Sequence, residues 1–323
     1  MKNRFLVLLT ISLFIFSLEQ QSAFAFKSTL QNNGELVSRD VYTFPSYEQA
    51  VEKTDAEKYS SKEEYEKAVA DKNFEFSKLK YMSDGLKVTA YLYKPKTITT
   101  KLPVIIFNRG SFVRGDIAPE LVTLFHKLAS DGFVVVAPMY RQSDGGEGRD
   151  EMGGGDLNDL MNVLPLIKSF DFADSNNLFM YGESRGGIMT YLALRRQFPV
   201  NAASVFGATS DMDRLLKDNP KAYPPAFLNQ IWADFDKNRE NIIKSRSAIH
   251  WAEEINAPVL IMNGGSDSGV SPIHSLTLAQ KLQSLNKTYQ LIIYAGDNHR
   301  LSKNQTDRDR QTISWFKSYL KKR

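Results

Sequence analysis

Residues 102–320 alternate between short apolar runs and amphipathic segments, and this alternation limits the fold more than any other feature of the chain. The runs LPVIIFN (102–108) and FVVVAPMY (133–140) are almost continuously apolar, and NNLFMYGES (176–184) has the apolar centre LFMY. A segment with helical spacing follows each run. Strands that are apolar on both sides belong to parallel sheets covered by helices on both faces. The sequence therefore predicts an α/β fold with a mostly parallel central sheet.

The alternation stops between residues 210 and 250 and then resumes. This interval contains Pro220, Pro224 and Pro225 together with a charged helical stretch. In open α/β folds, ligands bind at the carboxyl ends of the strands, and insertions at such ends commonly cover the site. We therefore expect a helical cap insertion at about 210–250 within a catalytic domain that spans 74–323.

Two different segments precede the alternating region. Residues 74–93 alternate with a period of two around the turn Ser83-Asp84-Gly85, which predicts a β-hairpin. Residues 26–73 are polar, and their stretch SKEEYEKAVADK has apolar positions at helical spacing with acids before bases. An N-terminal helical segment with a packing role and no catalytic grouping is expected there.

The first 25 residues have the organisation of a secretory signal peptide. Lys2 and Arg4 precede an apolar run of 14 residues, and Ala23-Phe24-Ala25 supplies small side chains for cleavage after Ala25. The alternative is a membrane anchor, which needs about 20 apolar residues. The chain has no cysteine, so disulfides, thiol catalysis and lipid attachment to an N-terminal cysteine are excluded. We expect an exported protein, periplasmic or secreted, with no stable membrane insertion after cleavage.

A serine stands between two glycines where the third apolar run meets a helical segment. Ser184 lies in the motif Gly182-Glu183-Ser184-Arg185-Gly186, after LFMY and before GIMTYLALRRQF. A tight strand-to-helix turn needs small residues two positions before and after the central residue, and it exposes the hydroxyl at the carboxyl edge of the sheet. The alternative is a chance occurrence of the motif, but this context predicts a nucleophile elbow.

A serine nucleophile needs a general base, and four histidines are available. His299 follows the apolar strand YQLIIY and the loop AGDN, at the carboxyl end of what should be the last strand. His126 lies inside a helical pattern, His250 lies where the insertion rejoins the sheet, and His274 lies in the first turn of a helix. We therefore assign the base to His299.

The base needs an acid that orients it, and Asp267 is the preferred candidate. Asp267 ends the strand PVLIMNGGSD, and two glycines just before it allow the backbone to turn. Ser184, Asp267 and His299 also follow the chain order of α/β-hydrolases. Three other carboxylates near strand ends compete for this role: Asp211, Asp213 and Asp297.

Two backbone N–H groups are candidates for an oxyanion hole. The first is that of Arg185, which follows the nucleophile. The second belongs to the loop Asn108-Arg109-Gly110-Ser111, where Gly110 allows the backbone to approach a substrate carbonyl, although the loop can also be a simple turn. Four arginines near strand ends are candidates for binding a substrate carboxylate: Arg109, Arg114, Arg141 and Arg185.

Taken together, these motifs resemble the catalytic domain of the prolyl oligopeptidase branch of the α/β-hydrolases. The matching blocks are GESRGG around Ser184, GGSDSGVSP around Asp267, GDNH at His299 and YRQSDGGEGRDEMGGGDLNDL from Tyr140, and the likeness covers about 74–320. The resemblance implies an acyl-enzyme on Ser184 that is hydrolysed by water activated by His299. The chain departs from the large peptidases of this family because no β-propeller precedes the hairpin. It also has NRGS where many relatives have a histidine and paired glycines, which leaves the second oxyanion donor open.

The remaining sequence features narrow the class of function. The net charge is +4 and the charges are spread along the chain, so nucleic acid is not an expected partner. The sequence has no metal-ligand cluster, dinucleotide fingerprint or phosphate loop, and no cofactor is expected. We expect a serine hydrolase acting on small-molecule carboxylic esters, with a peptidase of short peptides as the alternative. A non-catalytic binding protein is the third hypothesis, and the oligomeric state stays open.

Overall fold

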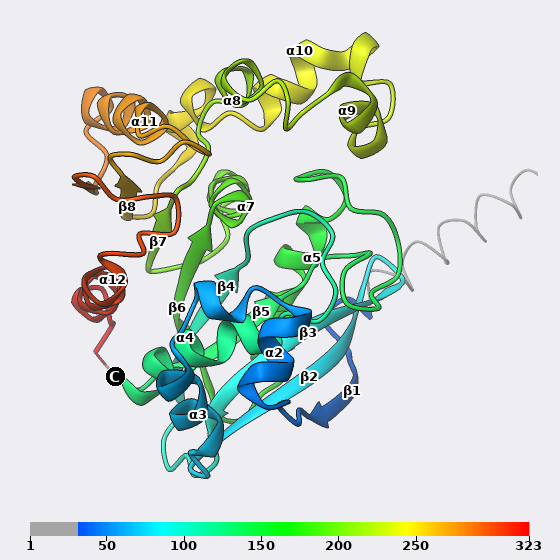
Figure 1. Ribbon diagram of the computed structural model, residues 1–323, viewed down its shortest axis with the longest axis vertical. Helices are drawn as coiled ribbons and strands as arrows, with labels where there is room; N and C mark the ends of the chain where they lie inside the picture. Colours follow the sequence, from blue (N-terminus) through cyan, green and yellow to red (C-terminus); the bar gives the residue numbers. More distant parts are fainter. Residues whose placement is uncertain (1–31, 323) are drawn as a thin grey trace, which may run out of the picture.

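This computed structural model describes residues 32–322, which contain a nine-stranded sheet (Figure 1). The strand order is β1-β2-β3-β5-β4-β6-β7-β8-β9. The pairs among the first four strands of this order are antiparallel, and the remaining pairs are parallel, which confirms the predicted mostly parallel sheet. The strands are β1 (Leu36–Val41), β2 (Phe74–Ser83), β3 (Leu86–Pro95), β4 (Leu102–Asn108), β5 (Val134–Pro138), β6 (Ala173–Glu183), β7 (Ala202–Phe206), β8 (Val259–Gly264) and β9 (Tyr289–Tyr294).

Helices cover both faces of the sheet because its central strands are apolar on both sides. On β4, for example, Val104 and Ile106 pack into one hydrophobic cluster, whereas Ile105 and Phe107 pack into the other. The first cluster includes side chains of α5 (Leu157–Met161), α6 (Val163–Lys168), α7 (Arg185–Arg195) and α11 (Ile273–Ser284). The second includes α4 (Ala118–Ser130) and α12 (Gln305–Ser318).

Three helices occupy the interval in which the strand and helix alternation stops. They are α8 (Met212–Asp218), α9 (Pro225–Ile231) and α10 (Phe235–Ser245), and they lie together at the top of the view in Figure 1. Short 3₁₀ turns at Ala248–His250 and Ala252–Glu254 return the chain to β8. The interval is therefore a helical layer inserted between β7 and β8.

The segment before the hairpin differs from the purely helical one that we expected for 26–73. Its helices, α2 (Tyr47–Lys53) and α3 (Lys62–Ala70), begin at capping boxes, in which Ser46 and Ser61 each exchange hydrogen bonds with the residue three positions later. However, β1 also belongs to this segment and pairs with β2 at the edge of the sheet. Most of its side chains are exposed, so the strand lacks the alternation of apolar and polar residues that would have revealed it.

The N-terminal prediction cannot be compared with the fold, because the expected signal peptide, residues 1–25, lies outside the described residues. Within residues 32–322, no helix is long and apolar enough to span a bilayer. The same residues contain the one sheet described above and no β-propeller.

Candidate active site

Ser184 lies at a sharp turn between β6 and α7. Its backbone has φ 53° and ψ −117°, a conformation that is strained for a residue with a side chain. The neighbouring glycines make the turn possible. A Cβ atom on Gly186 would lie 1.8 Å from the carbonyl oxygen of Asn108, and one on Gly182 would lie 2.5 Å from Oγ1 of Thr190. These contacts are the physical reason for the G-x-S-x-G pattern.

The structure brings Ser184, His299 and Asp267 into one hydrogen-bonded chain, although they are far apart in the sequence. The Ser184 Oγ to His299 Nε2 distance is 3.0 Å, and His299 Nδ1 lies 2.7 Å from Asp267 Oδ2. Ser184 follows β6, Asp267 follows β8 and His299 follows β9, so parallel strands deliver all three groups to the same sheet edge. This is the geometry of a nucleophile, a base and an orienting acid.

The carboxylate of Asp267 is held independently of the histidine. Its Oδ1 accepts hydrogen bonds of 2.8 Å from the backbone N–H groups of both Gly269 and Val270. Its Oδ2, which faces His299, also accepts a longer bond of 3.3 Å from the amide of Asn263. The carboxylate is therefore buried and fully hydrogen-bonded before a substrate arrives.

The competing carboxylates have other partners. Asp211 caps α8 by accepting the N–H of Arg214 at 3.1 Å. Asp213 pairs with Lys217 and Arg239, and Asp297 accepts the side-chain amide of Asn304 at 2.7 Å. None of these three carboxylates has a contact with His299 among the described residues, so the geometry favours Asp267.

The other three histidines have different surroundings: one is hydrogen-bonded to a tyrosine, one is exposed and one is buried. The ring of His126, on α4, lies 3.0 Å from the hydroxyl of Tyr93. His250 lies exposed in a 3₁₀ turn. His274 is buried on α11, and its ring nitrogens have no hydrogen-bond partner in the described part of the chain; burial lowers the pKa of this imidazole.

Two backbone N–H groups lie close to Ser184 and have no acceptor within residues 32–322. Arg185 opens α7, and the first N–H groups of a helix have no partner inside it. Gly110 lies in the loop after β4, where an added Cβ atom would be 3.3 Å from the Cβ of Ser184. Both groups are thus free to donate to a ligand at the nucleophile.

A cleft of about 330 Å³ opens at Ser184 and His299. One wall comes from the N-terminal segment, through Asp55 and Tyr59. The hydroxyl of Tyr59 donates to Oε1 of Glu183 at 3.2 Å, which ties this wall to the nucleophile elbow. Neither wall residue was predicted from the sequence, because nothing in a polar helical stretch indicates that Tyr59 will bond to a glutamate 124 residues away.

Charged side chains of both signs line this cleft. Arg114 pairs with Glu120, which also accepts the backbone N–H of Asp55 at 3.1 Å. Burial raises the pKa of the Glu120 carboxyl, against the opposing effects of that N–H and of Arg114. The guanidinium of Arg300, next to His299, lies 5.3 Å from the ring centre of Tyr59. The cleft is therefore lined by polar side chains and by charges of both signs.

A second, mainly apolar pocket of about 650 Å³ adjoins the cleft. Phe112 lines both cavities, and its ring centre lies 4.9 Å from that of Phe227 on the cap helix α9. Asp150 also lines the pocket and pairs with Arg185, the residue after the nucleophile. The pocket is large enough for a bulky apolar group, and it meets the catalytic cleft at Phe112.

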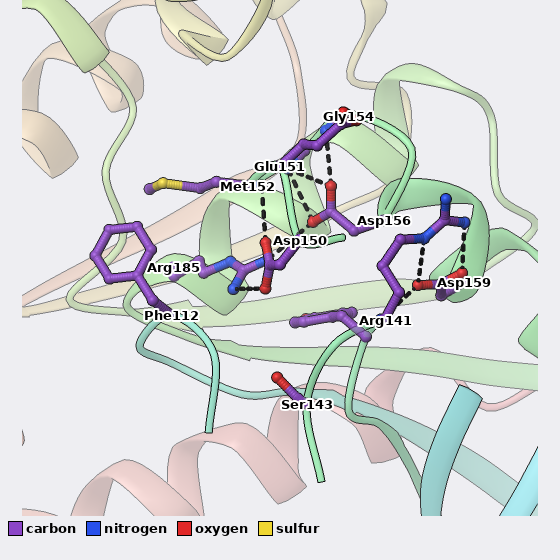
Figure 2. A network of polar contacts seen from close by, with 12 residues as sticks. Phe112, Arg141, Ser143, Asp150, Glu151, Met152, Gly154, Asp156, Asp159 and Arg185 are labelled. Atoms are coloured by element: carbon purple, nitrogen blue, oxygen red, sulfur yellow. Dashed lines mark hydrogen bonds and ion pairs between the residues drawn. The ribbon is translucent and has the colours of Figure 1, made fainter. Parts of the chain in front are cut away.

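The arginines near the strand ends are largely committed to internal partners, which does not support a role in binding a substrate carboxylate. Figure 2 shows the two strongest cases: Arg185 with Asp150 and Asp156, and Arg141 with Asp159. Arg114 pairs with Glu120, as described above. The fourth arginine, Arg109, is buried and bonds to backbone oxygens, an arrangement taken up below.

No cluster of three or more histidine or carboxylate side chains in residues 32–322 is arranged to hold a metal ion. The reactive groups that meet at the nucleophile are the serine hydroxyl, the imidazole, the carboxylate and the backbone N–H groups.

Comparison with known proteins agrees with this geometry. Residues 121–323 match the prolyl oligopeptidase family. The Bacillus subtilis (strain 168) "Uncharacterized peptidase YtmA" is 29% identical over 240 residues, which cover 74% of this chain and 91% of that protein. The acylamino-acid-releasing enzyme of Rattus norvegicus is 25% identical over 243 residues, which cover 68% of this chain but 32% of the enzyme.

Solved structures with similar folds are also peptidases and hydrolases of larger size. Pyrococcus horikoshii acylaminoacyl peptidase superposes with a TM-score of 0.63 at 20% identity, covering 78% of this chain and 43% of that one. A puromycin hydrolase superposes with a TM-score of 0.66 at 17% identity, covering 74% and 38%. These likenesses establish the α/β-hydrolase fold. The chain spans less than half of either structure and about a third of the rat enzyme.

Proposed function

The chain belongs to the prolyl oligopeptidase family of serine peptidases, and from this membership we propose that it hydrolyses short peptides, and esters of the same acyl groups, through an acyl-enzyme on Ser184. The observation that carries the proposal is the hydrogen-bonded chain from Ser184 through His299 to Asp267 at the cleft. Family membership favours peptides as substrates, whereas the sequence alone favoured esters.

In the first half of the reaction, Ser184 Oγ attacks the substrate carbonyl carbon while His299 Nε2 takes the hydroxyl proton. The N–H groups of Arg185 and Gly110 donate to the oxyanion that forms. His299 then gives the proton to the leaving nitrogen or oxygen, the bond to the carbonyl carbon breaks, and the acyl group stays on Ser184.

In the second half, His299 Nε2 takes a proton from water while the water oxygen bonds to the acyl carbon. The bond from that carbon to Ser184 Oγ then breaks and His299 returns the proton to Oγ, which leaves a carboxylic acid and free Ser184. Asp267 accepts a hydrogen bond from the Nδ1–H group of His299 throughout, which fixes the imidazole tautomer and stabilises the imidazolium. The bonds from Gly269 and Val270 keep the carboxylate in position for this role.

Two features support small substrates with an apolar acyl group. The mainly apolar pocket at Phe112 and Phe227 adjoins the catalytic cleft through Phe112, and its volume of about 650 Å³ suits a large hydrophobic side chain. Asp55 and Tyr59 line the cleft at Ser184, and its volume of about 330 Å³ suits a short peptide better than a long chain. We therefore expect aromatic or aliphatic residues at the acyl position of short peptides.

Labelling with a fluorophosphonate probe tests the nucleophile. Wild type should be labelled, and Ser184→Ala and His299→Ala should both lose labelling. Ser302→Ala is the matched control, because this exposed serine lies in the loop after His299 and bonds to Asn298 instead of to the histidine. A folded wild type that stays unlabelled would refute the proposal and favour a binding protein.

Paired substrates test the acyl preference. Anilides of phenylalanine and of aspartate share one leaving group, so their ratio of kcat/KM reports on the acyl pocket alone. Wild type should prefer phenylalanine, and Phe227→Ala should reduce this preference about 10-fold, in line with the loss of apolar contacts in a pocket. If wild type and Phe227→Ala show the same ratio of kcat/KM, the acyl group binds outside this pocket.

We further propose that the protein is exported through cleavage after Ala25. The support is the basic, apolar and small-residue order of residues 1–25. N-terminal sequencing of the protein recovered outside the cytoplasm should begin at Phe26, whereas a protein that keeps its first residues and stays in the cytoplasm would contradict the proposal.

A further inference from the structure

Arg109 is a buried cation without a carboxylate partner. Its side chain is 1% exposed, and no ion pair to it occurs within residues 32–322. Burial, with the nearby positive charge of Arg185, lowers the pKa of Arg109 to about 10. By contrast, burial is outweighed at Arg185 by Asp150 and Asp156, which raise its pKa. A buried charge without a counter-ion is costly, so the hydrogen bonds that Arg109 makes need an explanation.

Arg109 donates six hydrogen bonds, three to backbone carbonyls of the loop that follows β4 and three to the chain after β5. Nη1 donates to the carbonyl oxygens of Gly110 at 3.0 Å, Ser111 at 3.1 Å and Phe112 at 2.6 Å. Nε and Nη2 donate to Met139 at 3.1 and 2.7 Å, and Nη2 also donates to the hydroxyl of Ser143 at 2.6 Å. One guanidinium thus joins the loop to the chain after β5.

These bonds fix the orientation of the loop. In a trans peptide, the C=O group and the following N–H group point in opposite directions. Three consecutive carbonyls that turn inward to one guanidinium therefore restrict the peptide planes after Gly110. Ser111 has φ 65°, a conformation that a side-chain-bearing residue keeps only when its surroundings enforce it. Gly110, the candidate second oxyanion donor, is the first residue of this restrained loop.

Tyr140 connects this loop to the other candidate donor. The guanidinium carbon of Arg109 lies 5.0 Å from the ring centre of Tyr140, and that of Arg185 lies 4.9 Å from the same ring. Cations are attracted to an aromatic face, and Tyr140 is fully buried, so both contacts are desolvated. Arg185 also donates hydrogen bonds to the carboxylates of Asp150 and Asp156 (Figure 2).

We infer that Arg109 is a positioning residue that holds the oxyanion loop, and that its contact with Tyr140 couples the position of Gly110 to that of Arg185. The inference rests on the proposed function. It assigns a role to the arginine that stands where the sequence departs from the family pattern. A positioned donor matters most when negative charge has formed on the substrate oxygen, so Arg109 acts on the transition state more than on substrate binding.

The test compares Arg109→Met and Arg109→Lys with wild type on one phenylalanine anilide. Methionine keeps the apolar stem without donors, and lysine keeps the charge but has a single nitrogen in place of the guanidinium fork. Complete loss of one oxyanion donor costs about 10²–10³ in kcat. A displaced donor should cost less, so we expect kcat to fall about 10–100-fold in Arg109→Met with KM changed less than about 3-fold. The kcat of Arg109→Lys should lie between those of wild type and Arg109→Met.

Arg141→Met is the matched control. Arg141 is also largely buried and neighbours Tyr140, but its donors bond to Asp159 and Asp84, away from the loop. This variant should lose thermal stability while kcat per folded molecule stays near the wild-type value. If Arg109→Met lowers stability by a similar amount and leaves kcat unchanged, Arg109 is merely structural and the inference is wrong.

The affinity for a boronic acid is a second measurement, and it distinguishes a displaced oxyanion donor from a general loss of structure. A boronic acid with the same acyl group forms a tetrahedral adduct with the serine, so its affinity depends on the oxyanion donors. Arg109→Lys should weaken boronate binding about as much as it lowers kcat, with little change in KM. Unchanged boronate affinity in the folded variant would overturn the inference alone. A wild type without labelling by fluorophosphonate would overturn the proposed function and this inference together.

Discussion

The substitution Asp267→Asn tests the orientation of the catalytic imidazole. An amide can be accommodated at this site in two ways. In the first, its oxygen takes the place of Oδ1 and accepts the N–H groups of Gly269 and Val270. Its NH₂ group then points to Nδ1 of His299, which must become an acceptor. The proton of the imidazole moves to Nε2, and His299 can no longer take the proton of Ser184.

The alternative orientation places the NH₂ group against two backbone N–H donors. Each buried donor left without a partner costs about 1–3 kcal/mol, so this orientation costs about 2–6 kcal/mol. The first orientation creates one unfavourable contact, between the new NH₂ group and the side-chain amide of Asn263. The hydrogen bond that Asn263 donates to Oδ2 of Asp267 in the wild type is already long, at 3.3 Å. The unproductive tautomer is therefore favoured, and kcat should fall about 10⁴-fold, or about 5 kcal/mol.

Steady-state kinetics on an activated ester measure this loss, with circular dichroism to confirm folding. Asp213→Asn is the control, because Asp213 is a half-buried carboxylate after the preceding strand whose partners are Lys217 and Arg239. It should keep kcat within about 2-fold, as expected for a surface ion pair. An Asp267→Asn variant that keeps more than about a tenth of the wild-type kcat would refute the tautomer argument.

Three further predictions follow from buried contacts. Gly186→Ala should abolish labelling of Ser184, because the new Cβ would lie 1.8 Å from the carbonyl oxygen of Asn108; normal labelling would mean that the turn can relax. Arg185→Met leaves two buried carboxylates unpaired, which should cost about 3–5 kcal/mol and lower Tm by roughly 10 °C in a thermal melt; a shift below about 2 °C would contradict this. Burial lowers the pKa of His274, so the unfolded chain takes up a proton that the folded one does not, and the free energy of unfolding should fall as pH drops below about 6.5. His274→Leu should flatten this dependence between pH 5 and 8 in urea unfolding, and an unchanged slope would assign the effect to other groups.

Much of the fold was predictable because its elements are encoded locally. The apolar runs that became β4, β5 and β6 are buried on both faces, so they lack alternation and differ clearly from the amphipathic helices between them. By contrast, β1 was not predicted. An edge strand with exposed side chains is stabilised by its pairing with β2, and this pairing is not visible in the sequence of β1 itself.

The candidate site divides in the same way. Ser184 was recognisable because the tight turn imposes glycines on its immediate neighbours, and His299 because it follows a strand. The wall formed by Asp55 and Tyr59 gave no signal, since its proximity to Glu183 exists only in the folded chain.

The sequence by itself determined the class of fold, the elbow at Ser184 and a short list of bases and acids, because periodicity and tight turns depend on neighbouring residues. Only the tertiary structure decided which carboxylate meets His299 and which arginines are internal. It also decided that Arg109 is buried and bonds to backbone carbonyls of the loop of Gly110. Those choices depend on distances between segments that the sheet brings together, and no local pattern specifies them.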